Sequence, residues 1–213
     1  MSWRSRKGLV AAGWMLVICV GLLGTIAAWA IAPYPGYRYS LLDTAGAFIR
    51  APFADRIVLG DSRVRNAVPT DDALFIGYNG ATTRELERMA SVLCSVSDAP
   101  LVFALGVNDS QPWAIDTQAS LASVERVVEH CGPQRTYLME IWAVEPDKET
   151  LGKFYDPDTI AKLSHDFAKL AEQTGAHWAP APRLVGHTHD GVHFTPDVSR
   201  DYLAFLAALP RGR

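Results

Sequence analysis

The chain has no excess of basic residues, which argues against one class of partner. It contains 20 lysine and arginine residues and 23 aspartate and glutamate residues among 213. Beyond Ala32 there are 17 basic and 23 acidic residues, so this part carries a formal charge of −6. A nucleic-acid-binding surface needs a basic stripe that neutralises phosphates. The composition therefore indicates that nucleic acid is not a partner.

Cysteine is also scarce, with three residues in the chain. Cys19 lies in a long apolar run and is interpreted as a small apolar residue. Cys94 and Cys131 lie further along the chain, where an oxidising compartment would permit a disulfide bond. The sequence leaves two alternatives open for this pair, namely a disulfide or two buried thiols.

Charge is missing altogether from Leu9 to Ala32, a run of 24 residues. An apolar helix of this length can cross a bilayer, and the basic segment SWRSRK before it predicts a cytoplasmic N-terminus. We therefore expect residues 1–8 to be cytoplasmic and residues 9–32 to form a single-pass anchor in the inner membrane. The rest of the chain would then lie on the periplasmic side.

A cleaved signal peptide is the alternative to this anchor. Small residues near the end of the run, in AWA and AIA, have the spacing of a cleavage site. Signal-peptide cores, however, are usually about 7–15 residues long, and Pro33 directly after the run would hinder cleavage. These two features favour the uncleaved anchor.

The segment after the apolar run contains several residues that interrupt helices. Pro33, Pro35 and Gly36 occur in APYPGYRYS, which cannot easily continue a helix. We expect residues 33–54 to be a tether and residues 55–213 to be the folded domain. The chain is long enough for one domain with an ordinary core and too short for two.

Short apolar runs alternate with longer segments of helical periodicity in the domain. The predicted strands are residues 56–60, 73–78, 101–106, 136–142 and 176–181. The predicted helices are residues 82–96, 117–130, 157–175 and 196–209. Strands that are apolar on both faces and separated by helices indicate a parallel sheet covered on both sides. The expected fold is a three-layer α/β/α sandwich with a mostly parallel five-stranded sheet.

Polar residues follow several of the predicted strands. Ser62 follows the first, Gly80 the second and Asn108 the third, while Asp190 and His193 follow the last after a loop. A parallel sheet brings the carboxyl ends of its strands to one edge. A hydroxyl, an imidazole, a carboxylate and amide donors are the groups that acyl transfer through a serine requires. The sequence therefore predicts a serine-dependent active site at this edge.

The four blocks GDS, NG followed by ATT, GVND and DGVH resemble the SGNH or GDSL hydrolase superfamily, and they occur in its order between residues 57 and 196. The resemblance implies a flavodoxin-like fold with Ser62 as nucleophile, His193 as general base and Asp190 orienting His193. The oxyanion hole would comprise the backbone N–H groups of Ser62 and Gly80 and the side-chain amide of Asn108. No cofactor or metal is expected.

The sequence departs from the common pattern of this superfamily in two places. GDSRV lacks the leucine of the eponymous motif and has Arg63 there. GYNGATT is a compact second block, in which Gly80 rather than Gly77 is chosen because small and hydroxyl residues follow it. An α/β-hydrolase elbow is disfavoured, because G-x-S-x-G would need glycine where Val64 stands. Arg63 and Trp113 are the candidate substrate-binding residues.

A metal site is an alternative interpretation of HTHDGVH. This segment offers His187, His189, Asp190 and His193, which are possible zinc ligands. The metallo-hydrolase arrangement H-x-H-x-D-H would need the aspartate one place later and a histidine directly behind it. The spacing therefore favours the serine scheme over a metal.

The resemblance implies an esterase that removes acetyl or other short acyl groups, with an acylated glycan of the cell envelope or a small ester as substrate. No long apolar insertion is present to act as a lipase lid. A polysaccharide O-acetyltransferase using the same triad is one alternative, and it would depend on a multispanning membrane partner that supplies acyl groups. A non-catalytic envelope scaffold is the other.

Overall fold

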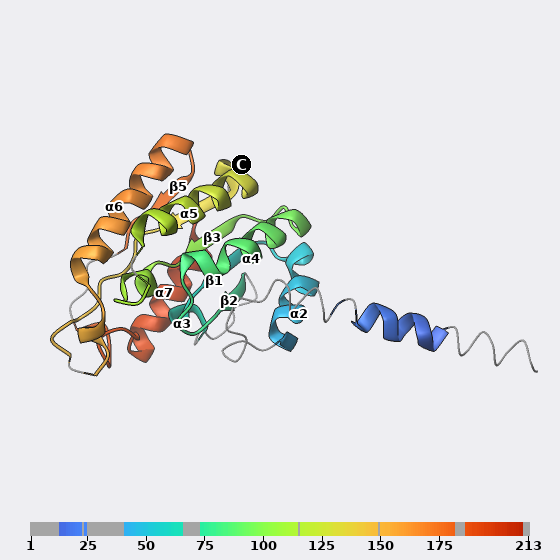
Figure 1. Ribbon diagram of the computed structural model, residues 1–213, viewed down its shortest axis with the longest axis horizontal. Coiled ribbons are helices and arrows are strands. Elements are labelled where there is room, and N and C mark those ends of the chain that lie inside the picture. The colour runs from blue at the N-terminus through green and yellow to red at the C-terminus, as the bar shows by residue number, and fades with distance from the viewer. Residues whose placement is uncertain are drawn as a thin grey trace, which may run out of the picture.

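A computed structural model describes residues 13–22, 24, 41–65, 73–114, 116–148, 150–181 and 186–210 of the chain. Its centre is a five-stranded sheet in which every pair of neighbouring strands is parallel, in the order β2-β1-β3-β4-β5 (Figure 1). The expected parallel α/β architecture is confirmed. Chain order reverses between β1 and β3, and open α/β sheets bind ligands in the crevice at such a reversal.

The five strands are short and apolar, as the sequence predicts. They are β1 (Ile57–Gly60), β2 (Leu74–Gly77), β3 (Leu101–Ala104), β4 (Thr136–Met139) and β5 (His177–Ala179). Every residue of β1, β3 and β4 is buried. These strands are inner members of the sheet, so helices cover both of their faces and alternation of polar and apolar residues is absent.

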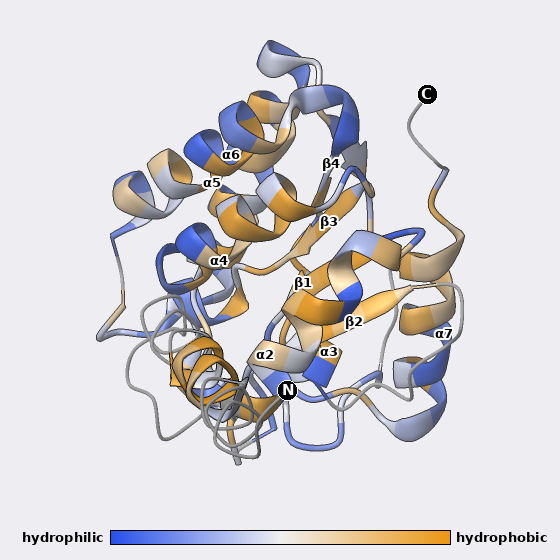
Figure 2. Cartoon of the chain, turned by 90° about the vertical axis from the view of Figure 1, so that its right-hand side faces the viewer, coloured by the Kyte–Doolittle hydropathy of each residue, from blue (hydrophilic) through white to orange (hydrophobic). Residues whose placement is uncertain are grey.

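The helices divide between the two faces of the sheet. They are α2 (Leu41–Arg50), α3 (Ser62–Arg65), α4 (Thr83–Val96), α5 (Thr117–Cys131), α6 (Pro157–Thr174) and α7 (Pro196–Ala208), with short 3₁₀ helices at Ala51–Phe53, Val107–Ser110, Pro133–Arg135 and Gly152–Phe154. One core cluster joins the sheet to α2, α4, α5 and α6, and a second joins its other face to α3 and α7. Figure 2 shows the apolar strands between helices that carry both hydrophobic and hydrophilic segments.

Local sequence signals fix the ends of the predicted helices. Thr82 and Glu85 form a reciprocal capping box at the start of α4. Asp156 caps α6, whose first residue is Pro157, and Gly175 ends α6 in a left-handed conformation with φ 78°. The predicted boundaries of these two helices are confirmed to within one residue.

The predicted tether at residues 33–54 is wrong for its second half. Residues 41–53 form α2 and a 3₁₀ helix that pack on the domain, with Ala47 and Ala51 in the core and Thr44 hydrogen-bonded to Tyr78 at 2.9 Å. This helix buries apolar side chains that a solvated tether would expose. The folded domain therefore begins by Leu41 rather than at residue 55, and residues 33–40 lie outside the described residues.

The expected membrane anchor falls mostly outside the described residues. Residues 13–22 are helical and exposed. Among the residues that the structure describes, no helix has both the length and the apolar content needed to cross a membrane.

The structure resolves the alternatives for the cysteine pair. Cys94 of α4 and Cys131 of α5 form a disulfide between helices that pack side by side, with their Cα atoms 5.1 Å apart. It closes a loop with a sequence separation of 37 residues. Such a bond restricts the unfolded chain and so stabilises the folded state.

Candidate active site

The candidate nucleophile, Ser62, lies just after the carboxyl end of strand β1. β1 ends at Gly60, Asp61 follows, and Ser62 begins the short helix α3. The carboxylate oxygen Oδ1 of Asp61 accepts a hydrogen bond from the backbone N–H of Arg63 at 2.8 Å, which fixes the turn around Ser62. Ser62 is 6% exposed and belongs to the lining of a cavity, so its hydroxyl lies in a depression rather than on an open surface.

Ser62, His193 and Asp190 form a continuous hydrogen-bonded chain. The distance from Ser62 Oγ to His193 Nε2 is 2.9 Å, and that from His193 Nδ1 to Asp190 Oδ2 is 2.7 Å. Because a carboxylate only accepts, Nδ1 carries the proton and Nε2 is free to accept the proton of the serine hydroxyl. Residues separated by 131 positions are thus brought together as the sequence predicts.

Asp190 is held as an anion. Burial raises the pKa of its carboxyl, but hydrogen bonds from the His193 ring and from the backbone N–H groups of His193 and Val192 outweigh burial and lower the pKa to about 2. Those backbone bonds, at 2.7 and 3.0 Å, both end on Oδ1, which leaves Oδ2 for the imidazole. One carboxylate therefore shapes the loop and orients the base.

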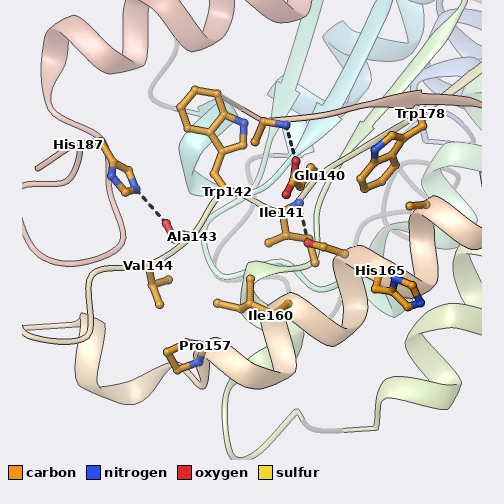
Figure 3. Close-up of a pocket in the computed structure, with 14 residues that line it drawn as sticks. Glu140, Ile141, Trp142, Ala143, Val144, Pro157, Ile160, His165, Trp178 and His187 are labelled. Carbon is orange, nitrogen blue, oxygen red and sulfur yellow. Dashed lines mark hydrogen bonds between the residues drawn. The ribbon is translucent and has the colours of Figure 1, made fainter. Parts of the chain in front are cut away.

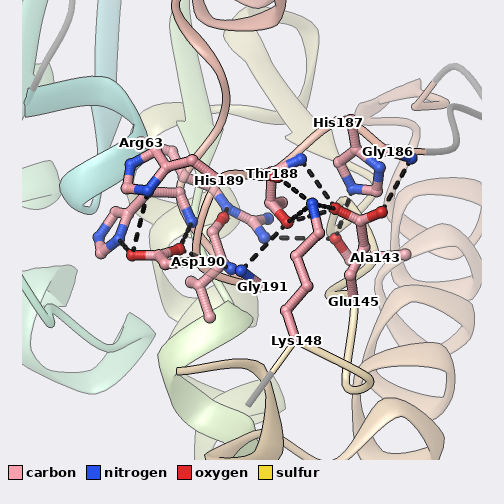
Figure 4. Close-up of polar contacts among 12 residues, drawn as sticks. Arg63, Ala143, Glu145, Lys148, Gly186, His187, Thr188, His189, Asp190 and Gly191 are labelled. Atoms are coloured by element: carbon pink, nitrogen blue, oxygen red, sulfur yellow. Dashed lines mark hydrogen bonds and ion pairs between the residues drawn. The ribbon is translucent and has the colours of Figure 1, made fainter. Parts of the chain in front are cut away.

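The loop that carries Asp190 and His193 is braced by Glu145 (Figure 4). Glu145 accepts hydrogen bonds from the backbone N–H groups of Thr188 and Gly186, both at 2.8 Å, and from the Thr188 hydroxyl. It also forms an ion pair with Lys148 at 2.9 Å. Burial raises the pKa of Glu145, but its hydrogen bonds with Thr188 and Lys148 prevail and lower it to about 2.

A close backbone contact explains the glycine between Asp190 and His193. Gly191 has φ 96°, and a Cβ there would lie 2.6 Å from the Cα of Gly152 and 2.8 Å from the carbonyl oxygen of Glu145. The backbone N–H of Glu145 donates to the carbonyl of Gly191 at 2.9 Å. The two loops can therefore interlock only with glycine at this position.

Asn108 lies at the end of β3, next to the strand that leads to Ser62. The two strands pair with Gly60 opposite Ala104, so Ser62 and Asn108 follow adjacent strand ends. Asn108 is 2% exposed, and its Nδ2 donates to the carbonyl of Ala81 at 2.9 Å. The amide has a second N–H, for which the described residues offer no acceptor, and this N–H is suited to an oxyanion.

Tyr155 orients the amide of Asn108 and is a residue that the sequence patterns did not reveal. Its hydroxyl donates to Asn108 Oδ1 at 3.1 Å and accepts from Gln111 Nε2 at 2.6 Å. Burial raises the pKa of Tyr155, and the charges of Asp61 and Asp190 raise it further. No local sequence motif surrounds Tyr155, so it can be found only from the fold.

Gly80 lies in the turn that follows β2, with φ 70°. This left-handed conformation suits glycine and directs the turn towards the start of α4. Gly77, the other glycine of GYNGATT, is the last residue of β2 itself. Gly80 thus follows the second strand, and its role as an oxyanion donor stays a prediction.

Arg63 has structural contacts that the sequence does not reveal. It is buried, and its guanidinium donates to the carbonyl oxygens of Val192 at 2.9 Å, Trp142 at 2.8 Å and Ala143 at 3.3 Å. It also lies 4.6 Å from the ring centre of Phe194. These contacts tie the loop of residues 186–195, the His193 loop, to the residues that follow β4. Arg63 also belongs to the lining of the cavity beside Ser62, and its role in substrate binding stays a prediction.

Trp113 is 72% exposed, in the loop after the 3₁₀ helix that contains Asn108. It does not belong to the described lining of the cavity beside Ser62 and His193. Its role in substrate binding stays a prediction.

The histidine-rich segment does bring possible metal ligands together. Ligand atoms of His189, Asp190 and His193 all lie within 4.8 Å of one another. Asp190 and His193 are, however, already hydrogen-bonded to each other and to Ser62. The other histidine, His187, donates from Nε2 to the carbonyl of Ala143 at 3.0 Å. Asp190 and His193 of this segment therefore belong to the hydrogen-bonded triad with Ser62.

Two cavities flank the His193 loop. One, of about 570 Å³, includes Ser62 and His193 in its lining. The other, of about 520 Å³, lies between the ends of β4 and β5 and helix α6, with Trp178 and His165 in its lining (Figure 3). Within its described lining, the second cavity touches the His193 loop only through His187. The first cavity is therefore the one connected to the chemistry.

The sequence matches no family model and no curated protein. Several solved structures share its fold. A lipase/acylhydrolase from Enterococcus faecalis is 16% identical and superposes with a TM-score of 0.59, covering 71% of this chain and 93% of its own. A GDSL-like lipase from Bacteroides thetaiotaomicron is 19% identical, with a TM-score of 0.57 and coverage of 73% and 85%.

A carbohydrate acetylesterase from Sinorhizobium meliloti is 16% identical, with a TM-score of 0.53, and covers 71% of this chain and 99% of its own. At these identities the likeness concerns the arrangement of strands and helices. The chain therefore has the fold of the SGNH/GDSL hydrolases, as the order of its sequence motifs predicts.

Proposed function

We propose that this protein is a serine esterase of the SGNH/GDSL superfamily that acts through an acyl-enzyme on Ser62. The observation that carries the proposal is the chain from Ser62 Oγ through the His193 ring to Asp190, with contacts of 2.9 and 2.7 Å. A buried serine that only capped a helix would not need an imidazole with a fixed tautomer. The likeness of the fold to esterases and acylhydrolases supports the same conclusion.

Acylation follows from the positions of these three side chains. Ser62 Oγ attacks the ester carbonyl carbon while its proton passes to His193 Nε2. Asp190, ionised because its hydrogen bonds lower its pKa to about 2, stabilises the imidazolium that forms. His193 then gives the proton to the alcohol oxygen as the carbon–oxygen bond breaks. Water, activated by the same imidazole, releases the acyl group as a carboxylic acid.

The negative oxygen of the tetrahedral intermediate is assigned to donors on the opposite side of Ser62 from His193. Asn108 supplies a side-chain N–H, kept in orientation by Ala81 and Tyr155. The backbone N–H groups of Ser62 and Gly80 complete the proposed oxyanion hole. Donors fixed before reaction stabilise developing charge without reorganisation in the transition state.

We propose an acetyl or other short acyl ester of a cell-envelope glycan as the substrate. One structural neighbour is a carbohydrate acetylesterase, which supports a carbohydrate ester. The expected anchor at residues 9–32 would hold the domain at the periplasmic face of the inner membrane, close to such a glycan. Intact N-terminal sequence in membrane-fraction protein would support the anchor, whereas a mature protein that starts near Ile31 would contradict it.

The proposed activity is tested by phenol release from phenyl acetate with the purified full-length chain. Wild-type turnover should disappear in Ser62→Ala. Adding an acetyl-free oligosaccharide then separates the outcomes, because an esterase releases acetate and a transferase forms an acetylated sugar. Turnover that persists in Ser62→Ala would contradict the serine mechanism, and a wild-type protein that neither turns over nor becomes acetylated would favour a scaffold.

A further inference from the structure

The cavity beside the triad lies on one side of Ser62 only. Apart from Ser62, Arg63 and three residues of the His193 loop, its described lining comes from α7 and includes Ser199, Leu203 and Ala204. Neither Gly80 nor Asn108 belongs to this described lining. The cavity therefore opens on the side of the general base and away from the proposed oxyanion donors.

The two core clusters show that these sides are different faces of the sheet. Ala81 and Val107, the neighbours of Gly80 and Asn108, pack in the cluster with α4, α5 and α6. Phe194 and Leu203, which line the cavity, pack in the cluster with α3 and α7, while Val192 of the same loop packs in the first cluster. The strand before Ser62 contributes Leu59 to the first cluster and Val58 to the second, so Ser62 stands between the two. We therefore place the proposed oxyanion donors on one side of a carbon atom bonded to its Oγ and the cavity on the other.

The chemistry of the reaction assigns one group to each side. The carbon of the tetrahedral intermediate carries the oxyanion, the acyl substituent and the oxygen of the alcohol. The oxyanion faces Asn108, and the alcohol oxygen must lie within hydrogen-bonding reach of His193 Nε2 to receive its proton. The part of the substrate that continues from the alcohol oxygen is then directed along His193 into the cavity.

We infer that the cavity between the His193 loop and α7 binds the alcohol half of the ester, a carbohydrate unit, and that α7 determines which alcohols are accepted. This inference rests on the proposed function of the same site. It places the acyl group outside this cavity, on the remaining side of Ser62.

The size of the cavity supports an alcohol much larger than methanol. Its volume is about 570 Å³, whereas one water molecule occupies about 30 Å³ of the liquid. An acetyl group, with three heavy atoms, would leave most of this space empty. A binding site for a ring with several substituents falls in the usual range for ligand cavities, about 300–1,000 Å³.

The lining has the polarity that a sugar ring requires. Phe194, Leu203 and Ala204 provide an apolar surface, while Ser199 and Arg200 provide a hydroxyl and a guanidinium group. Arg200 is 74% exposed in its side chain and pairs with Asp197 at 3.2 Å, so it lies at the rim. A pyranose ring presents C–H groups on its faces and hydroxyls at its edge, which fits an apolar wall with a polar rim.

The position of the cavity also links hydrolysis to transfer. When the carbon–oxygen bond breaks, the protonated alcohol leaves through the cavity, and the acyl group stays on Ser62. Water that enters the vacated space loses a proton to His193 and forms the carboxylic acid. A second sugar hydroxyl in the same space would react in the same way, with its proton passing to His193 and a new ester as the product.

The test uses Ala204→Trp in the full-length protein, with Ala208→Trp as the matched control. Both alanines are exposed on α7, and Ala208 does not belong to the described lining of the cavity. Two substrate series are compared by kcat/KM. One keeps the acetyl group and enlarges the alcohol from methyl acetate to an acetylated methyl glycoside, and the other keeps phenol and lengthens the acyl chain from acetate to octanoate.

Ala204→Trp should lower kcat/KM for the acetylated glycoside about tenfold relative to methyl acetate, the scale on which a pocket discriminates by size. The relative rates along the acyl series should match those of the wild type. Ala204→Leu should give a smaller loss in the same direction, and Ala208→Trp should resemble the wild type within about twofold in both series.

A selective loss on long acyl chains would overturn the inference and assign the cavity to the acyl group. Equal behaviour of Ala204→Trp and Ala208→Trp in both series would also overturn it. Failure of the proposed function has a different signature, because the wild type would then hydrolyse no ester or Ser62→Ala would retain activity.

Discussion

Two aspartate–serine pairs follow neighbouring strands of the sheet, and they have different surroundings. Asp61 and Ser62 follow β1, and Asp109 and Ser110 follow β3. All four residues are buried, and burial raises the pKa of both aspartates above the ordinary value. Ser62 Oγ lies 2.9 Å from an imidazole, whereas Ser110 Oγ donates to the carbonyl of Val107 at 2.8 Å.

The aspartates differ as well. Asp61 shapes the turn around Ser62 through the backbone N–H of Arg63. Asp109 accepts bonds from the backbone and hydroxyl of Thr83 and from the hydroxyl of Ser120, and so ties the start of α4 to α5. The Asp-Ser dipeptide after β1 therefore belongs to the proposed active site, because Ser62 contacts His193. The dipeptide after β3 holds structural elements together.

The largest expected effect separates the two serines. Ser62→Ala should lower kcat for phenyl acetate by about 10⁴-fold or more, the scale seen when a catalytic nucleophile is removed. Ser110→Ala should keep kcat within a few-fold and lower the free energy of unfolding by about 1 kcal/mol, the value of one hydrogen bond. Equal loss of activity in the two variants, both folded by circular dichroism, would remove the distinction.

Asn108 has the next largest expected effect, because its side-chain N–H is the proposed oxyanion donor. It precedes Asp109 in the 3₁₀ helix that follows β3. Asn108→Ala should lower kcat about 100- to 1000-fold with little change in KM. Tyr155→Phe removes the hydroxyl that orients the amide, so it should give a loss of about tenfold or less, again in kcat. Wild-type turnover in Asn108→Ala would exclude this amide from the oxyanion hole.

The residues with the largest expected effects are also those that the sequence reveals. Ser62, Gly80, Asn108, Asp190 and His193 follow predicted strands or form a short motif, so the parallel sheet alone implies that they converge. The strand and helix runs are equally clear because apolar periodicity is local. Ser62 and Ser110 can also be distinguished in the sequence, since only Ser62 matches a motif block.

Residues that support the site from a distance could not be predicted. Tyr155 and Glu145 lie in the segment between β4 and α6, where no apolar period or motif marks them. The burial of Arg63 and its three carbonyl partners likewise appear only in three dimensions, while its predicted role in substrate binding stays a prediction. The packing of α2 on the core was missed because proline and glycine before it suggested a tether.

Asp109→Asn tests the structural role of Asp109, which ties the start of α4 to α5. Its three donors, from Thr83 and Ser120, would face an amide that can accept at one atom only. The free energy of unfolding should fall by about 2–3 kcal/mol, the cost of unsatisfied buried donors. Chemical denaturation should show this loss, while kcat falls much less than in Asn108→Ala. A stable variant with abolished turnover would mean that Asp109 serves chemistry after all.

The smallest expected effect concerns Glu145, which fixes the His193 loop. Its pKa of about 2 in the folded state lies below the ordinary value of about 4.3. The carboxylate therefore stabilises the fold at pH values above about 4, and this contribution is lost as the pH falls through about 2. Glu145→Gln should lower the melting temperature at pH 7, and the difference from the wild type should shrink towards pH 2.

Glu172→Gln is the control for that titration, because Glu172 is exposed on α6. A surface substitution of this kind should change the free energy of unfolding by less than about 0.5 kcal/mol at any pH. A difference for Glu145→Gln that stays constant from pH 7 to pH 2 would show that the Glu145 charge does not hold the loop.

The proposed serine mechanism is tested most directly by finding which residue carries the acyl group during turnover. The full-length protein is mixed with phenyl acetate, quenched in acid within the first turnover and digested for peptide mass spectrometry. We expect an acetyl group on Ser62, none on Ser110, and faster loss of that group in the wild type than in Asp190→Asn. Turnover with the acetyl group on another residue, or with no acetylated peptide and full activity in Ser62→Ala, would contradict this mechanism.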